Sequence, residues 1–247
     1  MVLSDKTWFG KALRLPFWFI PDSACWPILS GPLRGRRWII QSSCRSCWLG
    51  VYEREKMDLL VKRLQPGSVF FDIGAQAGYF TVLASSLAGP AGHVVAFEPA
   101  PRNIDFLKQH VRLHNLGNVA ILEAAVAGQS GVSYFDPGPS FVAGRLSEAG
   151  SIPVRTLGLD EEIQAGRLPV PHFLKIDVEG AELELLRGSE WLLARHGPQI
   201  ALDIHSFLGP RFDHLDSGCR DLLASHGYRV KRLGAYDVYA WRSDLPE

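Results

Sequence analysis

Short apolar runs alternate with stretches of helical pattern along this chain from about residue 58 onward. Residues 68–73 and 93–97 are rich in Val and Phe and are bounded by Gly or Pro, as buried strands are. A helical pattern follows each run, and the same order returns after residue 172. Such alternation is typical of a parallel sheet that is covered by helices on both faces.

The full set of expected elements follows from this pattern. The expected strands are residues 68–73, 93–97, 119–126, 172–178, 199–204, 228–232 and 236–241. One expected helix ends near residue 64, and another starts near Pro101. The other expected helices are residues 79–87, 159–164, 181–195 and 212–225. The last two strands are joined by a short turn around Gly234, so they must pair antiparallel. We therefore predict an α/β fold with a mostly parallel sheet and one reversed strand near an edge.

Two regions stand apart from the alternation. Residues 127–160 are punctuated by Gly and Pro, and we predict a small insertion there with one or two short strands and a further strand at 152–157. Residues 1–50 hold seven basic residues against two acidic ones, and five of the seven tryptophans. We predict that residues 1–57 form a basic, tryptophan-rich cap on one domain of residues 58–247, because 247 residues suit a single α/β domain with a short appendage.

The N-terminal segment does not have the pattern of a targeting signal. Lys11, Arg14 and Pro16 interrupt its apolar run, whereas a secretory signal needs about 7–15 unbroken apolar residues. No run of about 18 apolar residues occurs, so a membrane span and an exported protein are not expected, and we predict a cytoplasmic location. The aromatic residues of the segment are expected to pack on the main domain, with contact to a membrane surface as the alternative: Trp8, Phe9, Phe17, Trp18 and Phe19.

Composition argues against nucleic acid as the main partner. Lys plus Arg equals Asp plus Glu, at 26 each, so the formal net charge is zero. Proteins that bind nucleic acid usually carry a basic excess. Nucleic acid is therefore not the expected partner.

Polar residues gather at the ends of the expected strands, where open α/β sheets bind ligands. The first strand ends in Asp72, and the following turn contains Gly74 and Gly78. Gln76 and Tyr79 occupy positions where the dinucleotide fingerprint needs small residues, so this turn is not that fingerprint.

The ends of the second and the fourth expected strand also carry charges. Glu98 lies 20 residues after Gly78, where a carboxylate can accept two hydrogen bonds from a ribose diol. This suits NAD and S-adenosylmethionine equally. Strand alternation places Lys175, Asp177 and Glu179 on one side of the strand at 172–178, where they could hold a cofactor amine, a substrate hydroxyl or a metal.

Three runs together resemble the FkbM family of S-adenosylmethionine-dependent methyltransferases: FFDIGAQAGYFT (70–81), FEPAPRN (97–103) and LKIDVEGAE (174–182). The resemblance covers about residues 50–210. It implies a Rossmann-like class I methyltransferase fold with seven strands, and O-methylation of hydroxyls on sugars and other natural products. NAD-dependent oxidation on the same fold is one alternative, and a non-catalytic S-adenosylmethionine-binding protein is another.

The resemblance also implies roles for individual residues. Asp72, Gly74 and Gly78 would frame the methionine end of the cofactor, and Gln76 stands in that turn where the family commonly has Asn. Glu98 would hold the ribose. Ala125, with its neighbours 124 and 126, would flank the adenine, and Asp177 would lie near the amino or sulfonium end.

Methyl transfer to an alcohol also needs a base to take the hydroxyl proton. His205 is the first candidate because its ordinary pKa suits neutral pH, and Asp177 and Glu179 follow. Glu53 is a further candidate from the N-terminal segment. Trp38 and Trp48 are expected to stack on a sugar acceptor, and no metal is predicted.

Other polar features have simpler interpretations. Cys44 and Cys47 form a single CxxC motif without a second pair, so zinc is not expected. Four histidines on helix patterns or at their ends are expected at the surface: His110, His114, His196 and His214.

Overall fold

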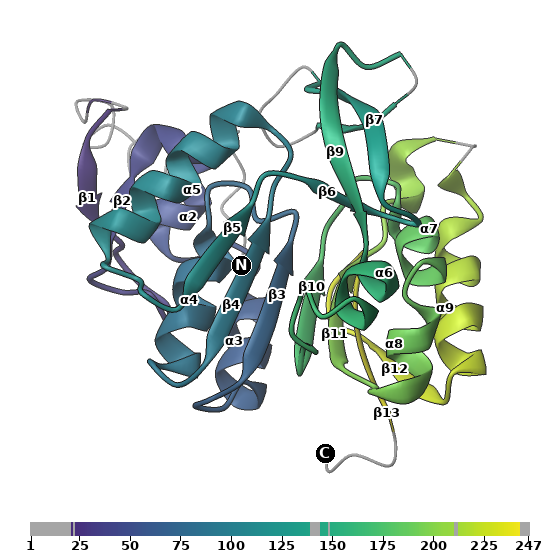
Figure 1. Cartoon of the computed structure of the whole chain (residues 1–247). Helices are drawn as coiled ribbons and strands as arrows, with labels where there is room; N and C mark the ends of the chain where they lie inside the picture. Colours follow the sequence, from purple (N-terminus) through teal and green to yellow (C-terminus); the bar gives the residue numbers. More distant parts are fainter. Residues whose placement is uncertain (1–20, 22, 139–143, 148, 210–211, 243–247) are drawn as a thin grey trace.

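The computed structural model describes residue 21 and residues 23–138, 144–147, 149–209 and 212–242 (Figure 1). The aromatic residues for which membrane contact is the alternative, at positions 8–19, lie outside this range. Within the part that is described, no helix combines the length and the apolar character that crossing a membrane requires.

A seven-stranded sheet forms the centre of the molecule, in the order β12-β13-β11-β10-β3-β4-β5. Strand β13 runs antiparallel to both of its neighbours, and the other neighbours pair in parallel. The expected mostly parallel sheet with a reversed strand near one edge is thereby confirmed. The strands are β3 (Val69–Ile73), β4 (His93–Phe97), β5 (Val119–Leu122), β10 (Phe173–Ile176), β11 (Gln199–Asp203), β12 (Tyr228–Arg232) and β13 (Asp237–Arg242).

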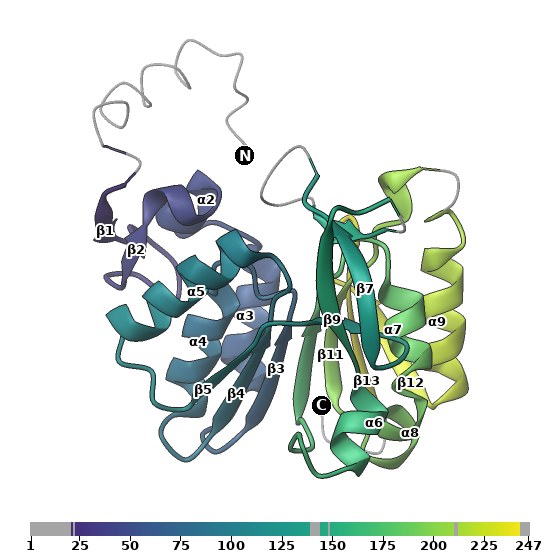
Figure 2. The same cartoon turned by 45° about the horizontal axis from the view of Figure 1, so that its top comes forward.

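Alternation along each strand sends side chains to two separate cores. Phe71 and Ile73 face one core and Phe70 faces the other, as the period of two in a strand requires. The first core is closed by α6 (Leu159–Gln164), α7 (Glu182–Arg187), α8 (Glu190–Arg195) and α9 (Leu215–Ser225). The second face is covered by α3 (Arg54–Arg63), α4 (Tyr79–Ala88) and α5 (Pro101–Leu113), as Figures 1 and 2 show.

The chain leaves β3 toward β4 and returns on the other side of β3 as β10. This reversal of direction opens a crevice beyond the carboxyl ends of β3 and β10. The register sets Lys175 beside Asp72 across this pair, so two buried charges of opposite sign lie next to each other below the crevice.

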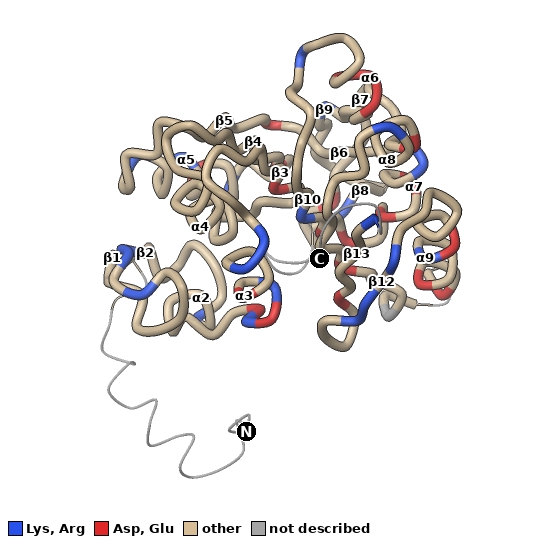
Figure 3. The backbone as a smooth tube through the Cα atoms, turned by 90° about the horizontal axis from the view of Figure 1, so that it is seen from below, with Lys and Arg blue, Asp and Glu red and all other residues tan. Residues whose placement is uncertain are grey.

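The N-terminal segment packs on α5 and α4 through a compact set of short elements. These are β1 (Cys25–Pro27), β2 (Arg37–Ile39), the 3-10 turn η2 (Ile40–Ser42) and α2 (Arg45–Leu49). The division between a cap and a main domain at residue 57 stays a prediction, and α3 runs across that position. Figure 3 shows acidic and basic residues interleaved along α3, and Arg54 pairs with Asp58 there.

Trp38 is fully buried between the segment and the helices α4 and α5. Its ring stacks on His110 of α5 with centroids 3.9 Å apart, and it meets Tyr79 edge-on. His110 accepts a hydrogen bond from the Ile39 amide at Nε2, and its Nδ1 bonds the carbonyl of Ala77. Burial lowers the pKa of His110 to about 4, so the ring is neutral. The surface placement expected for His110 is wrong, because the N-terminal segment covers this face of α5.

Replacing Trp38 by Ala is expected to lower the free energy of unfolding by about 3–5 kcal/mol, because a large buried ring is lost and a cavity remains. Urea unfolding followed by circular dichroism measures this. Trp26, its cross-strand partner, is 47% exposed and provides the control. Trp26→Ala is expected to cost about 1 kcal/mol or less. Equal costs for the two variants would show that the segment does not pack as described.

The insertion at 127–160 contains two short strands, β7 (Gly131–Asp136) and β8 (Arg145–Leu146), and the further strand β9 (Ile152–Gly158), as expected; they join β6 (Ala125–Ala127) in a second sheet. The structure corrects two other expectations of detail. The single strand expected at 119–126 is therefore divided between β5 and β6. The single helix expected at 181–195 is divided into α7 and α8, because the backbone of Gly188 packs directly against that of Gly128 and leaves no room for a side chain.

Candidate active site

A cavity of about 330 Å³ lies at the carboxyl ends of β3, β4, β10 and β11. Its volume falls in the range of about 300–1,000 Å³ that is usual for small-molecule sites. Seven of the predicted site residues line it: Gly74, Gln76, Glu98, Ala125, Asp177, Glu179 and His205. The sheet therefore brings together residues that are as far as 131 positions apart in the chain.

The turn after β3 forms the floor of the cavity. The amides of Gly74 and Ala75 both donate to the carbonyl of Phe97, which fixes the turn to the end of β4. Gly74 has φ of 74° and lies directly against the backbone of Asp177, so a side chain has no space there. Gln76 adopts φ of 50°, an uncommon conformation for a residue with a side chain.

Glu98 is buried at the end of β4 and faces this turn. One carboxylate oxygen accepts the amide of Gln76 at 2.8 Å, and the other accepts the amide of Ala100 at 2.9 Å. The oxygen that accepts from Ala100 also accepts a longer bond from the side-chain amide of Asn103, at 3.3 Å. The other oxygen has room for one ligand hydroxyl, and the second hydroxyl of a diol would replace Asn103. Burial raises the pKa of Glu98 to about 7, against the lowering effect of these amides.

Asp72 and Gly78 are close to the cavity but do not line it. Asp72 is fully buried, accepts a hydrogen bond from Thr81 of α4 at 2.5 Å, and lies 3.7 Å from the ammonium of Lys175. A Cβ on Gly78 would lie 2.5 Å from Leu107, so this glycine permits close helix packing. Contact of these two residues with the cofactor stays a prediction. In the structure, Asp72 and Gly78 lie on the side of the turn that faces away from the cavity, and they support the turn there.

Lys175 lies between the buried Asp72 and the cavity. Its ammonium donates to the carbonyl of Gly74 at 2.8 Å and lies 3.3 Å from the carboxylate of Asp177. Although burial acts in the opposite direction, Lys175 and other neighbouring cations lower the pKa of Asp177, which therefore stays ionised. Asp177 thus presents a fixed negative charge to the cavity.

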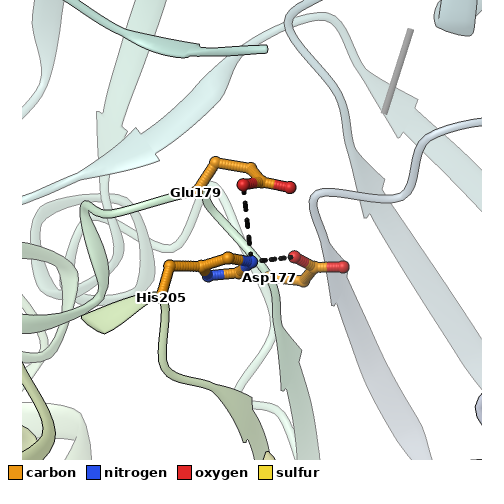
Figure 4. Close-up of side chains that lie close together, drawn as sticks. All are labelled: Asp177, Glu179 and His205. Atoms are coloured by element: carbon orange, nitrogen blue, oxygen red, sulfur yellow. Dashed lines mark ion pairs between the residues drawn. The ribbon is translucent and has the colours of Figure 1, made fainter. Parts of the chain in front are cut away.

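The three predicted catalytic side chains meet in one cluster, shown in Figure 4. Nε2 of His205 lies 3.6 Å from Asp177 and 3.5 Å from Glu179, and its Nδ1 lies 2.6 Å from the buried carboxylate of Glu182. Glu179 has φ of 52°, again an uncommon conformation for a residue with a side chain. Glu182 was not predicted. It is fully buried and orients the ring from behind the cavity.

The charges of this cluster change the expected role of His205. Burial disfavours the imidazolium, but the hydrogen bond to Glu182 and the nearby carboxylates of Asp177 and Glu179 outweigh it and raise the pKa of His205 to about 9. The ring is therefore protonated at neutral pH. Burial raises the pKa of Glu179 to about 7, although His205 opposes the shift. His205 therefore does not titrate near neutral pH in the folded protein, contrary to the expectation from its ordinary pKa, whereas Glu179 does.

Lys56 of α3 adds a buried cation that sequence analysis missed. Its ammonium contacts Asp203 at the end of β11, lies 2.6 Å from Glu53, and lies 3.6 Å from Asp237 at the start of β13. Lys56 is four positions before Leu60, on the buried side of α3, and this spacing is the signal that could have revealed it.

Two carboxylate-containing trios bring possible metal-ligating atoms within 4.8 Å of one another in the described part of the chain. One is Asp177, Glu179 and His205, and the other is Glu53, Asp177 and Asp203. Lys56 already pairs with Glu53 and Asp203 in the second trio. The absence of a metal from this site remains a prediction.

The N-terminal segment and the insertion both contribute to the cavity wall. Tyr52 and Glu53 come from the first, and Phe135 and Arg145 from the second. The tryptophans expected to stack on an acceptor do not line the cavity. Trp38 and Trp48 are buried in the core beneath the segment, so that expectation is wrong for both.

Comparison with known proteins places this architecture in a family. Residues 72–230 match the model of the methyltransferase FkbM domain. The chain is 30% identical over 161 residues to hexuronic acid methyltransferase AglP of Haloferax volcanii, covering 64% of this chain and 65% of that protein. It is 28% identical over 204 residues to 31-O-demethyl-FK506 methyltransferase FkbM of Streptomyces tacrolimicus, covering 68% of this chain and 75% of that protein. The chain thus spans slightly less than two thirds of the first of these relatives.

A solved structure shares the fold. The methyltransferase FkbM of Methylobacillus flagellatus superposes with a TM-score of 0.51 at 16% identity, over 70% of this chain and 43% of that one. The chain therefore belongs to the FkbM family of methyltransferases, as its three sequence runs indicated. S-adenosylmethionine is the cofactor of this methyltransferase family.

The cavity fits that cofactor on its own chemistry. The carboxylates that line it include Asp177, Glu179 and Glu98, and the sulfonium and amino groups of S-adenosylmethionine are cationic. The turn at Gly74 packs so closely on the backbone of Asp177 that only a glycine fits, and this holds the turn and the end of β10 together at the cavity floor. Asp177 and Glu98 would hold the cofactor at its amino or sulfonium end and at its ribose.

Cofactor binding is expected to depend on pH through Glu98. A ribose diol donates to an ionised carboxylate, so binding favours the deprotonated form. With a pKa of about 7, affinity for S-adenosylhomocysteine should fall about tenfold between pH 8 and pH 6. Calorimetry at several pH values measures this, and Glu98→Gln should flatten the dependence. An affinity that rises toward low pH would contradict this role.

The same raised pKa affects the stability of the unliganded protein in the opposite direction. Because the folded state disfavours the ionised form of Glu98, its contribution to the free energy of unfolding falls as the pH rises from about 4.5 to 7.

Proposed function

We propose that this protein transfers a methyl group from S-adenosylmethionine to a hydroxyl of a sugar, a glycan or glycolipid, or another natural product. One observation carries the proposal. Gly74, Glu98 and Asp177 line a single cavity at the point where the strand order reverses, in a chain of the FkbM methyltransferase family. The names of the two curated relatives, one acting on a hexuronic acid and one on an O-demethyl natural product, support this class of acceptor.

The task of the protein in this reaction is positioning and proton removal. S-adenosylmethionine supplies a methyl group that is already activated on a sulfonium centre, so orientation of the acceptor accounts for much of the rate. Asp177 holds a fixed negative charge because Lys175 lies 3.3 Å away. Glu98 is placed to bind the ribose diol. Glu98 directly follows β4 and Asp177 directly follows β10, and these two strands lie on opposite sides of β3. The two side chains would therefore set the direction of the cofactor in the cavity.

Glu179 is our proposed base for the acceptor hydroxyl. Its carboxylate lines the cavity and lies 3.5 Å from the imidazolium of His205, which stabilises the ionised form. Its pKa of about 7 allows it to accept a proton near neutral pH. His205 then acts as a positioning residue, held by Glu182. The alternative is that His205 itself is the base. In that case activity would rise toward pH 9, as the imidazolium loses its proton.

The wall of the cavity carries both carboxylates and cations. Glu53, Asp203 and Asp237 line it together with Glu179, and Lys56 pairs with the first three. Arg102 and Arg145 line the same cavity. Carboxylates accept from the hydroxyls of a polyol and arginines bind a carboxylate, so neutral sugars and uronic acids are both candidate acceptors.

The test is methyl transfer from isotopically labelled S-adenosylmethionine to acceptors supplied in pairs, each neutral sugar with its uronic acid. We expect label in a methyl ether, which alkali does not cleave. Label in an alkali-labile methyl ester or on nitrogen would contradict hydroxyl methylation. Cofactor binding without transfer to any member of a broad panel would favour the non-catalytic alternative. A small molecule or glycan as partner, and a cytoplasmic location, remain parts of the proposal.

A further inference from the structure

The CxxC motif of α2 is not used by the proposed reaction, yet its two thiols lie in contact. The sulfur atoms of Cys44 and Cys47 are 3.6 Å apart. Cys44 is partly exposed, whereas Cys47 is fully buried. The pair is therefore close enough to form a disulfide with a small side-chain movement, and its outer member is accessible to a reagent.

The two thiols also differ in protonation. The sulfur of Cys44 is in hydrogen-bond contact with Cys47, and this contact, with help from Ser46 and the Cys47 amide, lowers the pKa of Cys44 to about 5 against the effect of burial. Burial raises the pKa of Cys47 well above its usual value. A thiolate in contact with a protonated thiol is the arrangement of an attacking and a resolving cysteine.

Metal binding does not explain the pair. A structural zinc site needs four ligands from Cys, His or carboxylates. Among the residues that the structure describes, no trio of possible metal-ligating side chains includes a cysteine. Disulfide formation needs only the two residues that are present.

Ser43 connects the pair to the floor of the cavity. Its hydroxyl donates to the side-chain oxygen of Gln76 at 2.7 Å, and it accepts from the Cys47 thiol at 3.6 Å. Gln76 lines the cavity and donates its amide to Glu98. A disulfide would remove the Cys47 proton and draw its sulfur toward Cys44, so Ser43 would lose one of the contacts that hold it against Gln76.

We propose that Cys44 and Cys47 are a reversible redox modification site for two-electron oxidants of the peroxide class, and that the disulfide loosens the cofactor turn through Ser43 and Gln76. The Cys44 thiolate attacks one peroxide oxygen, the O–O bond breaks, and the leaving hydroxide takes a proton to become water. The Cys47 sulfur then displaces the hydroxyl of the resulting sulfenic acid, which leaves as a second water with the Cys47 proton. Two thiols are oxidised by two electrons and one peroxide is reduced.

The experiment treats the reduced full-length chain with a small excess of hydrogen peroxide. A Cys25→Ser/Cys219→Ala variant keeps only the proposed pair. We expect an intact mass lower by two hydrogen atoms, a peptide containing linked Cys44 and Cys47, and full reversal by dithiothreitol. No intramolecular disulfide in this variant would overturn the proposal. Cys44→Ser, at the partly exposed position, should prevent the disulfide, and Cys47→Ala should give a Cys44 sulfenic acid that dimedone traps.

The link to the cofactor turn has a readout that needs no cofactor. Amide hydrogen exchange in residues 72–80 should be about three- to tenfold faster in the oxidised form, as expected for the loss of about one hydrogen bond. Affinity for S-adenosylhomocysteine should fall by a similar factor. Exchange and affinity that both stay within twofold would overturn the link. A reduced protein that binds no S-adenosylhomocysteine would count against the proposed function, while the mass and exchange measurements would still decide this proposal.

Discussion

Replacing Glu98 by Ala is expected to weaken S-adenosylhomocysteine binding by about 30- to 1,000-fold, measured by calorimetry at pH 8. The carboxylate is buried and would accept hydrogen bonds from the ribose diol, each worth about 1.5–3 kcal/mol when the acceptor is charged, less the long bond to Asn103 that the second hydroxyl would replace. The variant also removes the acceptor for the amide of Gln76, so the cofactor turn loses a support.

Glu123 provides a matched control for that measurement. It follows β5, the strand next to β4, but it is exposed and pairs with Lys108 outside the cavity. Glu123→Ala should bind S-adenosylhomocysteine within about threefold of the wild type. If Glu98→Ala also bound within threefold, the ribose would not lie at the end of β4 and the proposed direction of the cofactor would be wrong.

Replacing Glu179 by Gln is expected to lower the rate of methyl transfer by about 10²- to 10⁴-fold, which is the usual contribution of a positioned base. The amide keeps the size of the side chain but accepts no proton. Because Asp177 and Glu98 remain, S-adenosylhomocysteine affinity should change by less than about threefold. The measurement combines turnover on the best acceptor of the panel with calorimetry on the same preparation.

Two comparisons decide the role of Glu179. Glu184→Gln, an exposed change on α7, should leave both quantities unchanged. In the wild type, activity should rise with pH through about 7 as Glu179 loses its proton. If Glu179→Gln kept full turnover and activity rose through about 9 instead, His205 would be the base.

Much of the fold could be predicted from the sequence because its signals are local. The strand β4 and the helix α6 have the expected bounds, since each is a short apolar or amphipathic run between Gly and Pro punctuation. The divisions of β5 from β6 and of α7 from α8 could not be predicted. β6 leaves the main sheet to pair with β9, where Ala125 lies opposite Thr156, 31 positions later, and Gly188 after α7 packs against Gly128, 60 positions earlier.

The candidate site was predictable to the extent that it depends on strand ends. Glu98 and Asp177 reach the cavity because parallel strands bring their carboxyl ends to one edge. The partners that set the charge of the site were not predictable in the same way. Lys56 comes from the N-terminal part of the chain and pairs with Asp203, 147 positions later. Glu182 reverses the protonation expected for His205, and only the packing of α7 against the sheet brings the two together.

The most direct test of the central claim is calorimetric titration of the wild-type protein with S-adenosylhomocysteine, beside a parallel titration with NAD. A cavity with a diol-binding carboxylate and an ionised Asp177 predicts micromolar binding of S-adenosylhomocysteine and no measurable binding of NAD. Heat of binding with NAD alone would favour the oxidoreductase alternative. No binding of S-adenosylhomocysteine at any pH from 6 to 8 would contradict the methyltransferase account.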